Sequence, residues 1–499
     1  MRKRILAFAL VLTMALVIAA CGNNDDNGAQ GDHASGLEPV ELLIYFLGDG
    51  APDNDEVFEL INERTSELIN TTMRPMMISW ADFATRYPLV FASGEYFDII
   101  FTASWSFYAD QAVRGGFYNL TMDMLEAYAP NIVDRMPAEA FQQARIGGNV
   151  YMVPNNQAGF NHAGIMIRGD LRRAHGIPEI TSVDLFVDYL LAITDEPGII
   201  PLDAGSDFDA WAVFEIFLNQ PQGWFSRPVP FYVFRMDDPT GQVFNMSDTQ
   251  AYRDFLTLTR ELNQAGVWRM DALTNPNSTV DNFMAGRSGS ALHNMHTLSL
   301  AWQEAMEHFP EWEPELIDGT FGTPTVRGSF LGNGFGIRAI SQHPERSLMW
   351  LEAMRSDREL YDLIMYGIEG RHWIDEGNNQ RSLGPDNANF GGFSNWAFTC
   401  DAMRRRATDE WPGQQAHDAS MNARAIPSPA MHFLFDDVDL ANEMAAMSNL
   451  STTYDGMLLF GFDADWEATV ARLNQQYDSL GRQEIVEEYM RQLREFLAD

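Results

Sequence analysis

The sequence predicts an α/β fold in which a parallel sheet is joined by crossover helices. Short apolar runs that stop at glycine or polar residues alternate with segments of helical periodicity, which is the pattern of such folds. The chain has 499 residues, of which 46% are hydrophobic and 12% aromatic. Domains cluster near ~100–200 residues, so we expect two or three globular units with real cores.

The first strand, helix and strand set the direction of the sheet. Residues 40–47 form an apolar run that ends at Gly48, and a helical pattern covers residues 57–69. A second helix is expected over 87–92 and a second strand over 97–101. Such an order predicts parallel strands, and ligands then bind beyond the carboxyl ends of the strands. Asp49, Ser104 and Trp105 are therefore expected at a pocket rim.

The middle of the chain continues the alternation. Residues 146–154 read as a hairpin, and a strand over 163–167 leads into a short helix. Thr181 is expected to cap the next helix, because a threonine hydroxyl can accept a bond from a free N–H of the first turn. A further strand over 290–292 ends at His293 and Asn294.

The charge balance excludes several classes of protein. The 33 Lys and Arg face 70 Asp and Glu, a net charge of −37. This argues against nucleic-acid binding and against a polybasic membrane contact. Lys3 is the only lysine, so phosphate-binding loops that end in lysine and lysine Schiff bases are absent. The lack of lysine reflects either a genomic preference for arginine or an adaptation to salt. Neither explanation indicates a function.

The N-terminus predicts an exported lipoprotein. A basic start at residues 1–4 precedes an apolar run over 5–20, and small residues precede Cys21. The pattern resembles the bacterial lipobox, which implies a signal peptide over 1–20 and a lipid (palmitate) on Cys21. The alternative is an ordinary secretory peptide. The polar stretch 21–37 reads as a flexible tether, and the expected location is the extracellular face of the cell membrane.

Metal and cofactor sites are not expected. With Cys21 lipidated, Cys400 is the only remaining thiol, so neither an internal disulfide nor a cysteine zinc site is expected. Asp203, Asp207 and Asp209 could hold calcium through oxygen ligands, but the full calcium-loop pattern is missing and a solvated loop is favoured. His293 and His296 lack the partners of a metal site. We expect no metal and no cofactor.

Several later motifs occur in an order that is typical of one family. They are Ser93–Gly94–Glu95, Gly148–Asn149–Val150–Tyr151, Arg168–Gly169–Asp170–Leu171, Asn333–Gly334–Phe335–Gly336–Ile337, Tyr366–Gly367–Ile368–Glu369–Gly370–Arg371–His372–Trp373 and Tyr477–Asp478–Ser479–Leu480–Gly481. Together they resemble the extracellular solute-binding proteins of ABC sugar importers (family 1 type), in particular the large lipoprotein subgroup of Gram-positive bacteria. The resemblance covers roughly residues 38–499. Asn149 and Arg371 replace lysines that are usual in the subgroup.

The resemblance implies a two-lobed, periplasmic-binding-protein-like fold of type II, with the ligand cleft between the lobes. Lobe 1 is expected to combine 38–154 plus 297–335, and lobe 2 to combine 155–296 plus 336–499. Chain crossings are expected near 153–156, 294–297 and 334–337. Ligand contact with both lobes would drive a hinge closure.

Sugar binding needs aromatic faces for the C–H side of the ring and polar groups for the hydroxyls. Aromatics with polar or glycine neighbours, and polar residues at strand ends and crossings, are therefore the candidates. The predicted ligand-binding residues are Asp49, Ser104, Trp105, Asn155, Asn156, Trp211, Trp224, His293, Asn294, Trp302, Glu369, Arg371, His372, Trp373 and Trp396. Glu369 and Arg371 could instead pair with each other. Trp80, Trp268, Trp312, Trp350, Trp411 and Trp466 are interpreted as packing or surface residues.

Three functions remain open at this point. The favoured one is a binding protein that captures a carbohydrate, most simply an oligosaccharide, and delivers it to ABC transporter permease subunits without acting as an enzyme. The second is a membrane-tethered glycoside hydrolase or lyase, which would need a pair of cleft carboxylates. The third is a surface adhesin or sensor module of the same fold.

Overall fold

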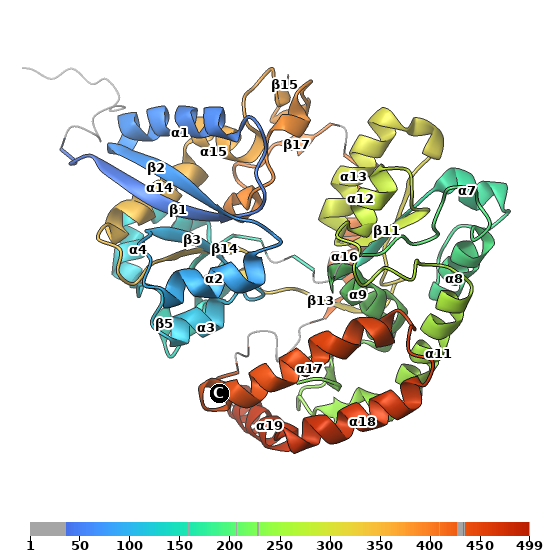
Figure 1. The fold of residues 1–499 in the computed structure, drawn as a ribbon. Coiled ribbons are helices and arrows are strands. Elements are labelled where there is room, and N and C mark those ends of the chain that lie inside the picture. The colour runs from blue at the N-terminus through green and yellow to red at the C-terminus, as the bar shows by residue number, and fades with distance from the viewer. Residues whose placement is uncertain are drawn as a thin grey trace, which may run out of the picture.

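The computed structural model describes residues 36–498, except 158, 161, 206, 227–228, 409, 427–432 and 434. The predicted signal peptide, Cys21 and nearly all of the tether lie outside the described residues. The chain forms two α/β lobes that lie side by side (Figure 1), which confirms the predicted fold class. Within the described part of the chain, no helix has the length and apolar character needed to cross a membrane.

Lobe 1 is built on a five-stranded sheet of order β2-β1-β3-β14-β6. Its strands are β1 (Val40–Leu47), β2 (Thr71–Ile78), β3 (Ile99–Thr102), β6 (Val153–Pro154) and β14 (Gly334–Ile337). β1 pairs in parallel with β3, as predicted, and also with β2, a strand that was not predicted. β14 is antiparallel to both β3 and β6. The sheet therefore takes one strand, β14, from a segment that lies more than two hundred residues after β3 in the chain.

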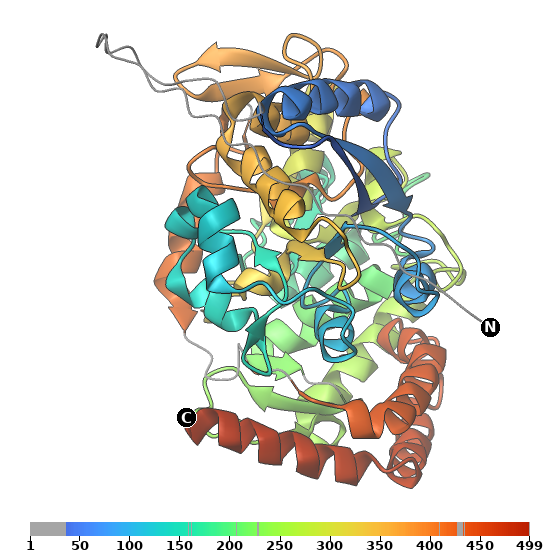
Figure 2. The same cartoon turned by 90° about the vertical axis from the view of Figure 1, so that its left-hand side faces the viewer.

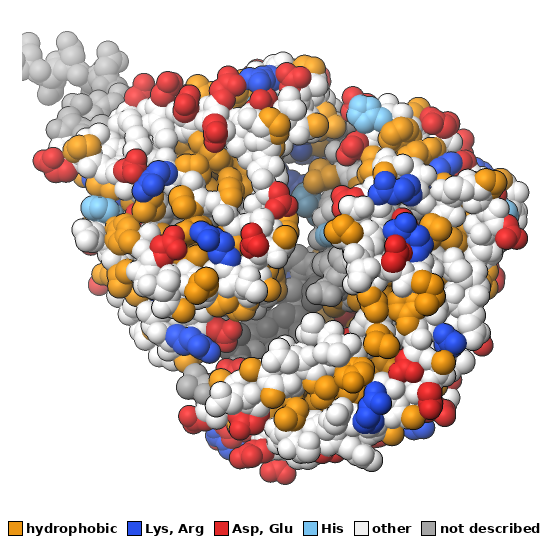
Figure 3. Space-filling model, viewed as in Figure 1, with side chains coloured by type: hydrophobic (Ala, Val, Ile, Leu, Met, Phe, Trp, Pro, Cys, Tyr) orange, Lys and Arg blue, Asp and Glu red, His pale blue; other side chains and the backbone are white. Residues whose placement is uncertain are grey.

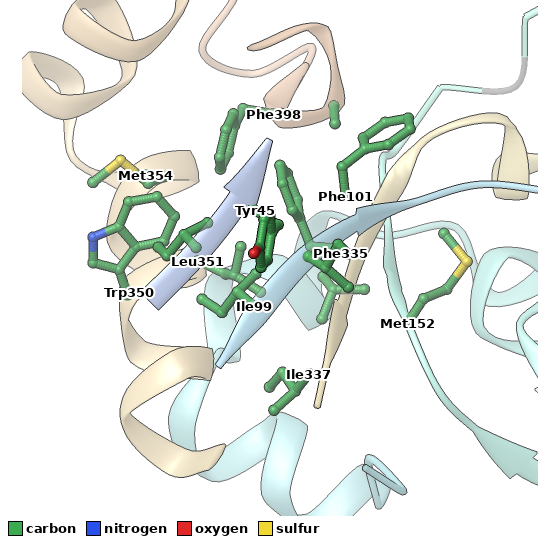
Figure 4. Close-up of a cluster of buried hydrophobic side chains, with 14 of the residues drawn as sticks. Tyr45, Ile99, Phe101, Met152, Phe335, Ile337, Trp350, Leu351, Met354 and Phe398 are labelled. Carbon is green, nitrogen blue, oxygen red and sulfur yellow. The ribbon is translucent and has the colours of Figure 1, made fainter. Parts of the chain in front are cut away.

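Helices and a hairpin cover the lobe 1 sheet and seal its core. They are α1 (Asn54–Ile69), α2 (Phe83–Ala92), α3 (Tyr108–Val113), α4 (Met122–Tyr128), α5 (Pro130–Arg135), α6 (Ala138–Gln143), α14 (Pro344–Ser356) and α15 (Arg358–Tyr366), with the hairpin β4 (Arg145–Ile146) and β5 (Asn149–Val150). Figure 4 shows the core between sheet and helices, where Phe335 of β14 and Trp350 of α14 lie near Phe398. These three side chains are fully buried, so the late segment is part of the first lobe's core.

Lobe 2 has a three-stranded antiparallel sheet of order β11-β7-β12. The strands are β7 (Gly164–Ile167), β11 (Ser290–His293) and β12 (Glu315–Ile317). The surrounding elements are α7 (Gly169–Ala174), α8 (Val183–Ala192), α9 (Asp207–Phe214), the π-helix Glu215–Asn219, α10 (Gln220–Gln222), α11 (Gln250–Gln264), α12 (Thr279–Met284), α13 (Met295–His308) and a small sheet of β8 (Trp224–Ser226), β9 (Tyr232–Arg235) and β10 (Phe244–Asn245). The expected cap Thr181 is wrong by one residue: the Ser182 hydroxyl accepts the bond from the Leu185 N–H.

Three C-terminal helices complete lobe 2. They are α17 (Ala441–Leu459), α18 (Trp466–Ser479) and α19 (Arg482–Ala498), and they lie together at one end of the molecule (Figure 2). Leu458, Leu473 and Leu493, one from each helix, are buried in the lobe 2 core. Their burial explains why this segment belongs to lobe 2 although lobe 1 residues precede it.

The lobe boundaries differ from the prediction. Segment 297–326 was expected in lobe 1, but Leu298 and Leu316 pack in a lobe 2 cluster with the neighbouring strands. Segment 336–407 was expected in lobe 2, but it supplies α14, α15 and the sheet of β15 (Trp373–Gly377), β16 (Gln380–Leu383) and β17 (Arg406–Ala407) beside lobe 1. The error arises because β14 pairs with β3 and keeps the following helices on that side.

Three connections link the lobes. The first runs from β6 to β7, next to the predicted crossing at 153–156. The second runs from β12 to β14 and contains β13 (Thr325–Val326), so the predicted crossing at 334–337 lies at its end. The expected crossing at 294–297 is wrong, since the chain passes there from β11 into α13 within lobe 2. The third follows β17 and contains α16 (Gln414–Arg424) and β18 (Ala425–Ile426), which pairs with β13.

Candidate ligand-binding site

The carboxyl ends of the lobe 1 strands face lobe 2. β14 starts at Gly334, directly after the second connection, and Gly334 pairs with Thr102 at the carboxyl end of β3. The carboxyl ends of β1 and β2 lie at the same edge because both strands run parallel to β3. The surface is hollowed between the lobes on this side (Figure 3). This is the edge at which ligands bind in parallel sheets.

Three tryptophans at this edge form what we call the tryptophan platform: Trp80, Trp105 and Trp396. Trp80 lies two residues after β2 and Trp105 three residues after β3, and both are 48% exposed. Trp80 is nearly parallel to both partners. Its ring centroid is 6.3 Å from that of Trp105 with the planes at 21°, and 6.1 Å from that of Trp396 with the planes at 10°. Neighbouring exposed aromatic rings at a strand-end edge make this surface the candidate binding site.

Two of the three rings are held by hydrogen bonds from their indole N–H groups. Trp105 Nε1 donates to the Gly332 carbonyl oxygen at 2.8 Å, and Trp396 Nε1 donates to Asn333 Oδ1 at 2.9 Å. Phe101, fully buried at the end of β3, contacts both rings at 5.5 and 6.1 Å. The platform is therefore supported from the core of lobe 1.

Polar groups surround the platform. The predicted Asp49 is exposed after β1, and its Oδ1 accepts the N–H of Trp80 at 3.3 Å. The predicted Ser104 is exposed after β3, and its N–H donates to the Leu331 carbonyl. Carboxylate and hydroxyl groups beside aromatic rings suit a ligand with apolar faces and polar edges.

The N-terminal end of α13, in lobe 2, carries two further predicted residues. The predicted His293 and Asn294 lie there, and Asn294 Oδ1 caps the helix by accepting the Thr297 N–H at 2.9 Å. Burial lowers the pKa of His293 to about 4, so its ring is neutral at pH 7. Burial, and then the charges of Arg404 and Arg381 from lobe 1, lower the pKa of His296. The two lobes thus approach each other here.

Trp373 was predicted to face the ligand, and this prediction is wrong. Its side chain is 2% exposed and packs with Tyr361, Tyr366 and Met403. The indole N–H donates to the Gly367 carbonyl at 3.0 Å, so Trp373 holds its own loop. The polar neighbours in sequence misled the prediction, because Arg371 and His372 interact with Asp53 and do not mark an exposed loop.

The rest of that motif fastens the start of α1. Arg371 pairs with Asp53 at 2.5 Å and with Glu56 at 2.6 Å rather than with Glu369, whose side chain is exposed. His372 is fully buried: its Nδ1 accepts the Ile368 N–H, and its Nε2 lies 3.1 Å from Asp53 Oδ2. The hydrogen bond from His372 lowers the pKa of Asp53. The predicted ligand roles of Arg371 and His372 therefore give way to structural ones.

Other predicted residues lie in cores or at the hinge. Trp224 is 5% exposed in the lobe 2 core, and Trp302 donates from Nε1 to the Pro314 carbonyl inside lobe 2. Asn155 is 5% exposed, and its N–H donates to the Asn333 carbonyl. Asn156 Oδ1 accepts the Asp401 N–H at 3.3 Å. The two asparagines tie the first connection to lobe 1.

Trp211 lies half-buried within α9 and not at a loop junction. Its side chain hydrogen-bonds to Glu215 in the π-helix, and Asn219 Nδ2 donates to both Glu215 carboxylate oxygens at 3.0 and 3.1 Å. Burial raises the pKa of Glu215 to about 7. A π-helix often accompanies a functional site, but Glu215 itself is only 6% exposed.

The calcium alternative receives no support from the two aspartates whose side chains are described. Asp203 pairs with Arg269 at 3.0 Å, and Asp209 accepts from the Gly205 and Thr279 N–H groups. The side chain of Asp207 lies outside the described residues. No group of three potential metal ligands occurs among the residues that the structure describes.

Trp80 is the site residue that the sequence analysis missed. Its strand, β2, was not predicted because Arg74 and Pro75 interrupt the apolar run. The signal was nevertheless present: Ser79, Ala81 and Asp82 around Trp80 are the small and polar neighbours by which Trp105 and Trp396 were selected.

Comparisons with known proteins agree with this fold. A family described as a domain of unknown function (DUF3502) matches residues 429–498, the region of α17 to α19. A "carbohydrate ABC transporter substrate-binding protein" of Streptococcus pneumoniae serotype 4 is 24% identical over 99% of this chain and 98% of its own length.

Solved structures resemble the chain over nearly its whole length. The N-glycan transport solute-binding protein NgtS of Streptococcus pneumoniae, in complex with Man1GlcNAc, has a TM-score of 0.76 at 18% identity and covers 92% of this chain and 100% of its own. The alginate-binding protein AlgQ2 has a TM-score of 0.65 at 13% identity, covering 93% of this chain and 100% of its own.

The molecule has the two-lobed fold of an ABC transporter solute-binding protein. This confirms the resemblance inferred from the sequence motifs.

Proposed function

We propose that this protein captures an oligosaccharide between its lobes and delivers it to the permease of an ABC transporter. The observation that carries the proposal is the tryptophan platform at the carboxyl ends of the lobe 1 strands, on the edge of the sheet from which the second connection leads to lobe 2. The likeness to a carbohydrate substrate-binding protein and to NgtS supports the same reading. These relatives are binding proteins, which favours capture over the hydrolase or lyase alternative.

The size of the platform favours a ligand of more than one sugar ring. Its rings are spaced by 6.1 and 6.3 Å, so one sugar cannot lie centrally on all three. Stacking on an aromatic ring contributes about 0.5–1.5 kcal/mol, by analogy with aromatic pairs. Several such contacts, together with contacts between sugar hydroxyls and Asp49 and Ser104, give a longer glycan a more favourable binding free energy than a monosaccharide.

Titration calorimetry against mono-, di- and longer glycans tests this function. Binding of a longer glycan without cleavage, together with compaction of the molecule in solution scattering, is the expected result. Binding to free monosaccharides alone contradicts the oligosaccharide proposal. Appearance of shortened products after long incubation favours the hydrolase or lyase instead.

We further propose that Cys21 carries a lipid that holds the protein on the extracellular face of the membrane. The support is the basic, apolar and small-residue order that ends at Cys21. Mass spectrometry of the mature N-terminus is expected to find a diacylglyceryl-modified Cys21. The Cys21→Ser variant is expected to lose the lipid, and an unmodified Cys21 in the wild-type protein contradicts the proposal.

A further inference from the structure

Asn333 joins the tryptophan platform to two of the three connections between the lobes. Its Oδ1 accepts the indole N–H of Trp396 at 2.9 Å. Its main-chain carbonyl accepts the N–H of Asn155, on the first connection, at 2.9 Å. Asn333 itself lies at the end of the second connection, one residue before β14. A single residue therefore contacts a ring of the platform and both chain crossings.

The residues before Asn333 make the same kind of link. The Gly332 carbonyl accepts the indole N–H of Trp105 at 2.8 Å, and the Leu331 carbonyl accepts the Ser104 N–H at 2.7 Å. Gly332 and Asn333 thus hold two of the three platform rings, and Leu331 holds the main chain of the residue before Trp105. These hydrogen-bond acceptors lie at the end of the second connection, and the two rings are bonded directly to them.

We propose that Asn333 is a positioning residue that couples the orientation of Trp396 to the opening and closing of the lobes. The inference rests on the proposed function and adds to it a route by which ligand stacking biases closure. A ligand shifts the open–closed equilibrium only through contacts that differ between the two states. A ring bonded to a hinge segment provides such a difference, because its tilt changes with the lobe angle.

Substitutions can separate this coupling from general damage. Asn333 has an extended backbone with φ −157° and ψ 145°, so alanine fits without strain. Asn333→Ala removes the acceptor, whereas Asn333→Asp keeps it. Trp396→Phe removes the donor and keeps an aromatic face. These variants form a double-mutant cycle, which measures coupling as the departure from additivity.

The measurement is the distance distribution between spin labels on the two lobes, at the exposed positions Glu63 and Glu261, in ligand-free protein. The buried Cys400 is replaced by alanine throughout. We expect Asn333→Ala to change the ratio of open to closed populations about 2- to 10-fold, the equivalent of one hydrogen bond. Trp396→Phe is expected to produce a similar change, the double variant no further change, and Asn333→Asp the wild-type distribution.

Two outcomes overturn the inference: an unchanged distribution in Asn333→Ala, or an effect of Asn333→Ala that is equally large in the Trp396→Phe background. Because this readout needs no ligand, it is independent of the glycan titrations. If glycans bind but the effects of Asn333→Ala and Trp396→Phe on the distance distribution are additive, the coupling is refuted and the proposed function stands. Failure of every glycan to bind, with the coupling intact, refutes the proposed function alone.

Discussion

The ring of Trp80 lies parallel to that of Trp396, with 6.1 Å between the centroids and 10° between the planes, although the two residues are 316 positions apart. Trp80 follows β2 and Trp396 lies in the 3₁₀ turn Asn395–Phe398. The contact between the two rings brings the end of β2 and the 3₁₀ turn Asn395–Phe398 into one candidate binding surface. Because Trp80 is 48% exposed, its ring contributes little to folding, and we expect its role to lie in binding.

Trp80→Ala is expected to weaken binding of a longer glycan about 2- to 10-fold, because one stacking contact of about 0.5–1.5 kcal/mol is lost. The melting temperature is expected to change little, since the side chain is 48% exposed. Calorimetric titration and a melting curve measure both effects. Trp466→Ala is the control, because Trp466 lies in α18 and packs on the lobe 2 core. Equal affinity of Trp80→Ala and wild type would remove Trp80 from the site.

Trp373→Ala is expected to destabilise lobe 1 by about 3–5 kcal/mol, the range for truncating a buried aromatic side chain. The variant leaves a cavity among Tyr361, Tyr366 and Met403 and removes the bond to the Gly367 carbonyl. Denaturant unfolding measures the loss. Trp373→Phe serves as the comparison and is expected to lose less. Weakened glycan binding at unchanged stability would restore the original prediction that Trp373 faces the ligand.

His162 and His417 are expected to make the protein less stable in acid. His162 lies on the first connection and His417 in α16 of the third, with ring centroids 5.6 Å apart. Burial lowers the pKa of His162 to about 4, and burial also lowers that of His417. Asp318 acts in the opposite direction on both rings, and Arg424 adds to the lowering.

The sign follows from proton binding. Between pH 6.5 and 4 the unfolded chain takes up a proton at His162 that the folded chain does not, so stability falls as the pH falls. The loss reaches about 3 kcal/mol by pH 4 for His162. Denaturant unfolding at pH 7 and 4.5 is expected to show a smaller pH effect in His162→Gln than in wild type. An identical pH effect in both proteins contradicts a neutral, buried His162.

Glu215→Gln is expected to stabilise the protein at pH 8 and to have less effect at pH 5. The pKa of Glu215, raised to about 7 by burial, means that the folded chain holds a proton there that the unfolded chain loses above about pH 4.5. Stability therefore falls as the pH rises through 7. Glutamine is neutral at every pH and removes this dependence, a gain of about 1–3 kcal/mol at pH 8. Denaturant unfolding curves of both proteins at pH 8 and pH 5 measure this gain. An equal stability change at the two pH values contradicts the raised pKa of Glu215.

Continuous apolar runs were predicted well from the sequence, and segments that depend on distant partners were not. β1 was found at its observed bounds, because its apolar run is continuous and residues 44–47 are buried on both faces. β2 was missed, because at the edge of the sheet it carries Arg74 and Pro75. Missing β2 also meant missing Trp80, since the criterion for a rim residue was its place after a strand.

The direction of individual tryptophan side chains could not be read from their neighbours. Trp105 and Trp373 both follow polar or glycine residues, yet one is 48% exposed and the other 2%. Only the tertiary packing of α15 and the loop after it decides that Trp373 points inward. The lobe assignment failed for a similar reason, because pairing of β14 with β3 joins segments far apart in the chain.

The insertion of β14 between β3 and β6 has a consequence for how the chain is made. Synthesis begins at the N-terminus, so β1, β2 and β3 emerge long before β14. Until then β3 presents an unpaired edge, the kind of surface that invites pairing with other chains. The strand that ends this exposure arrives directly behind Gly332 and Asn333, which hold two of the platform rings. The nascent protein therefore loses this unpaired edge and acquires the hydrogen-bond acceptors for Trp105 and Trp396 at the same step of synthesis.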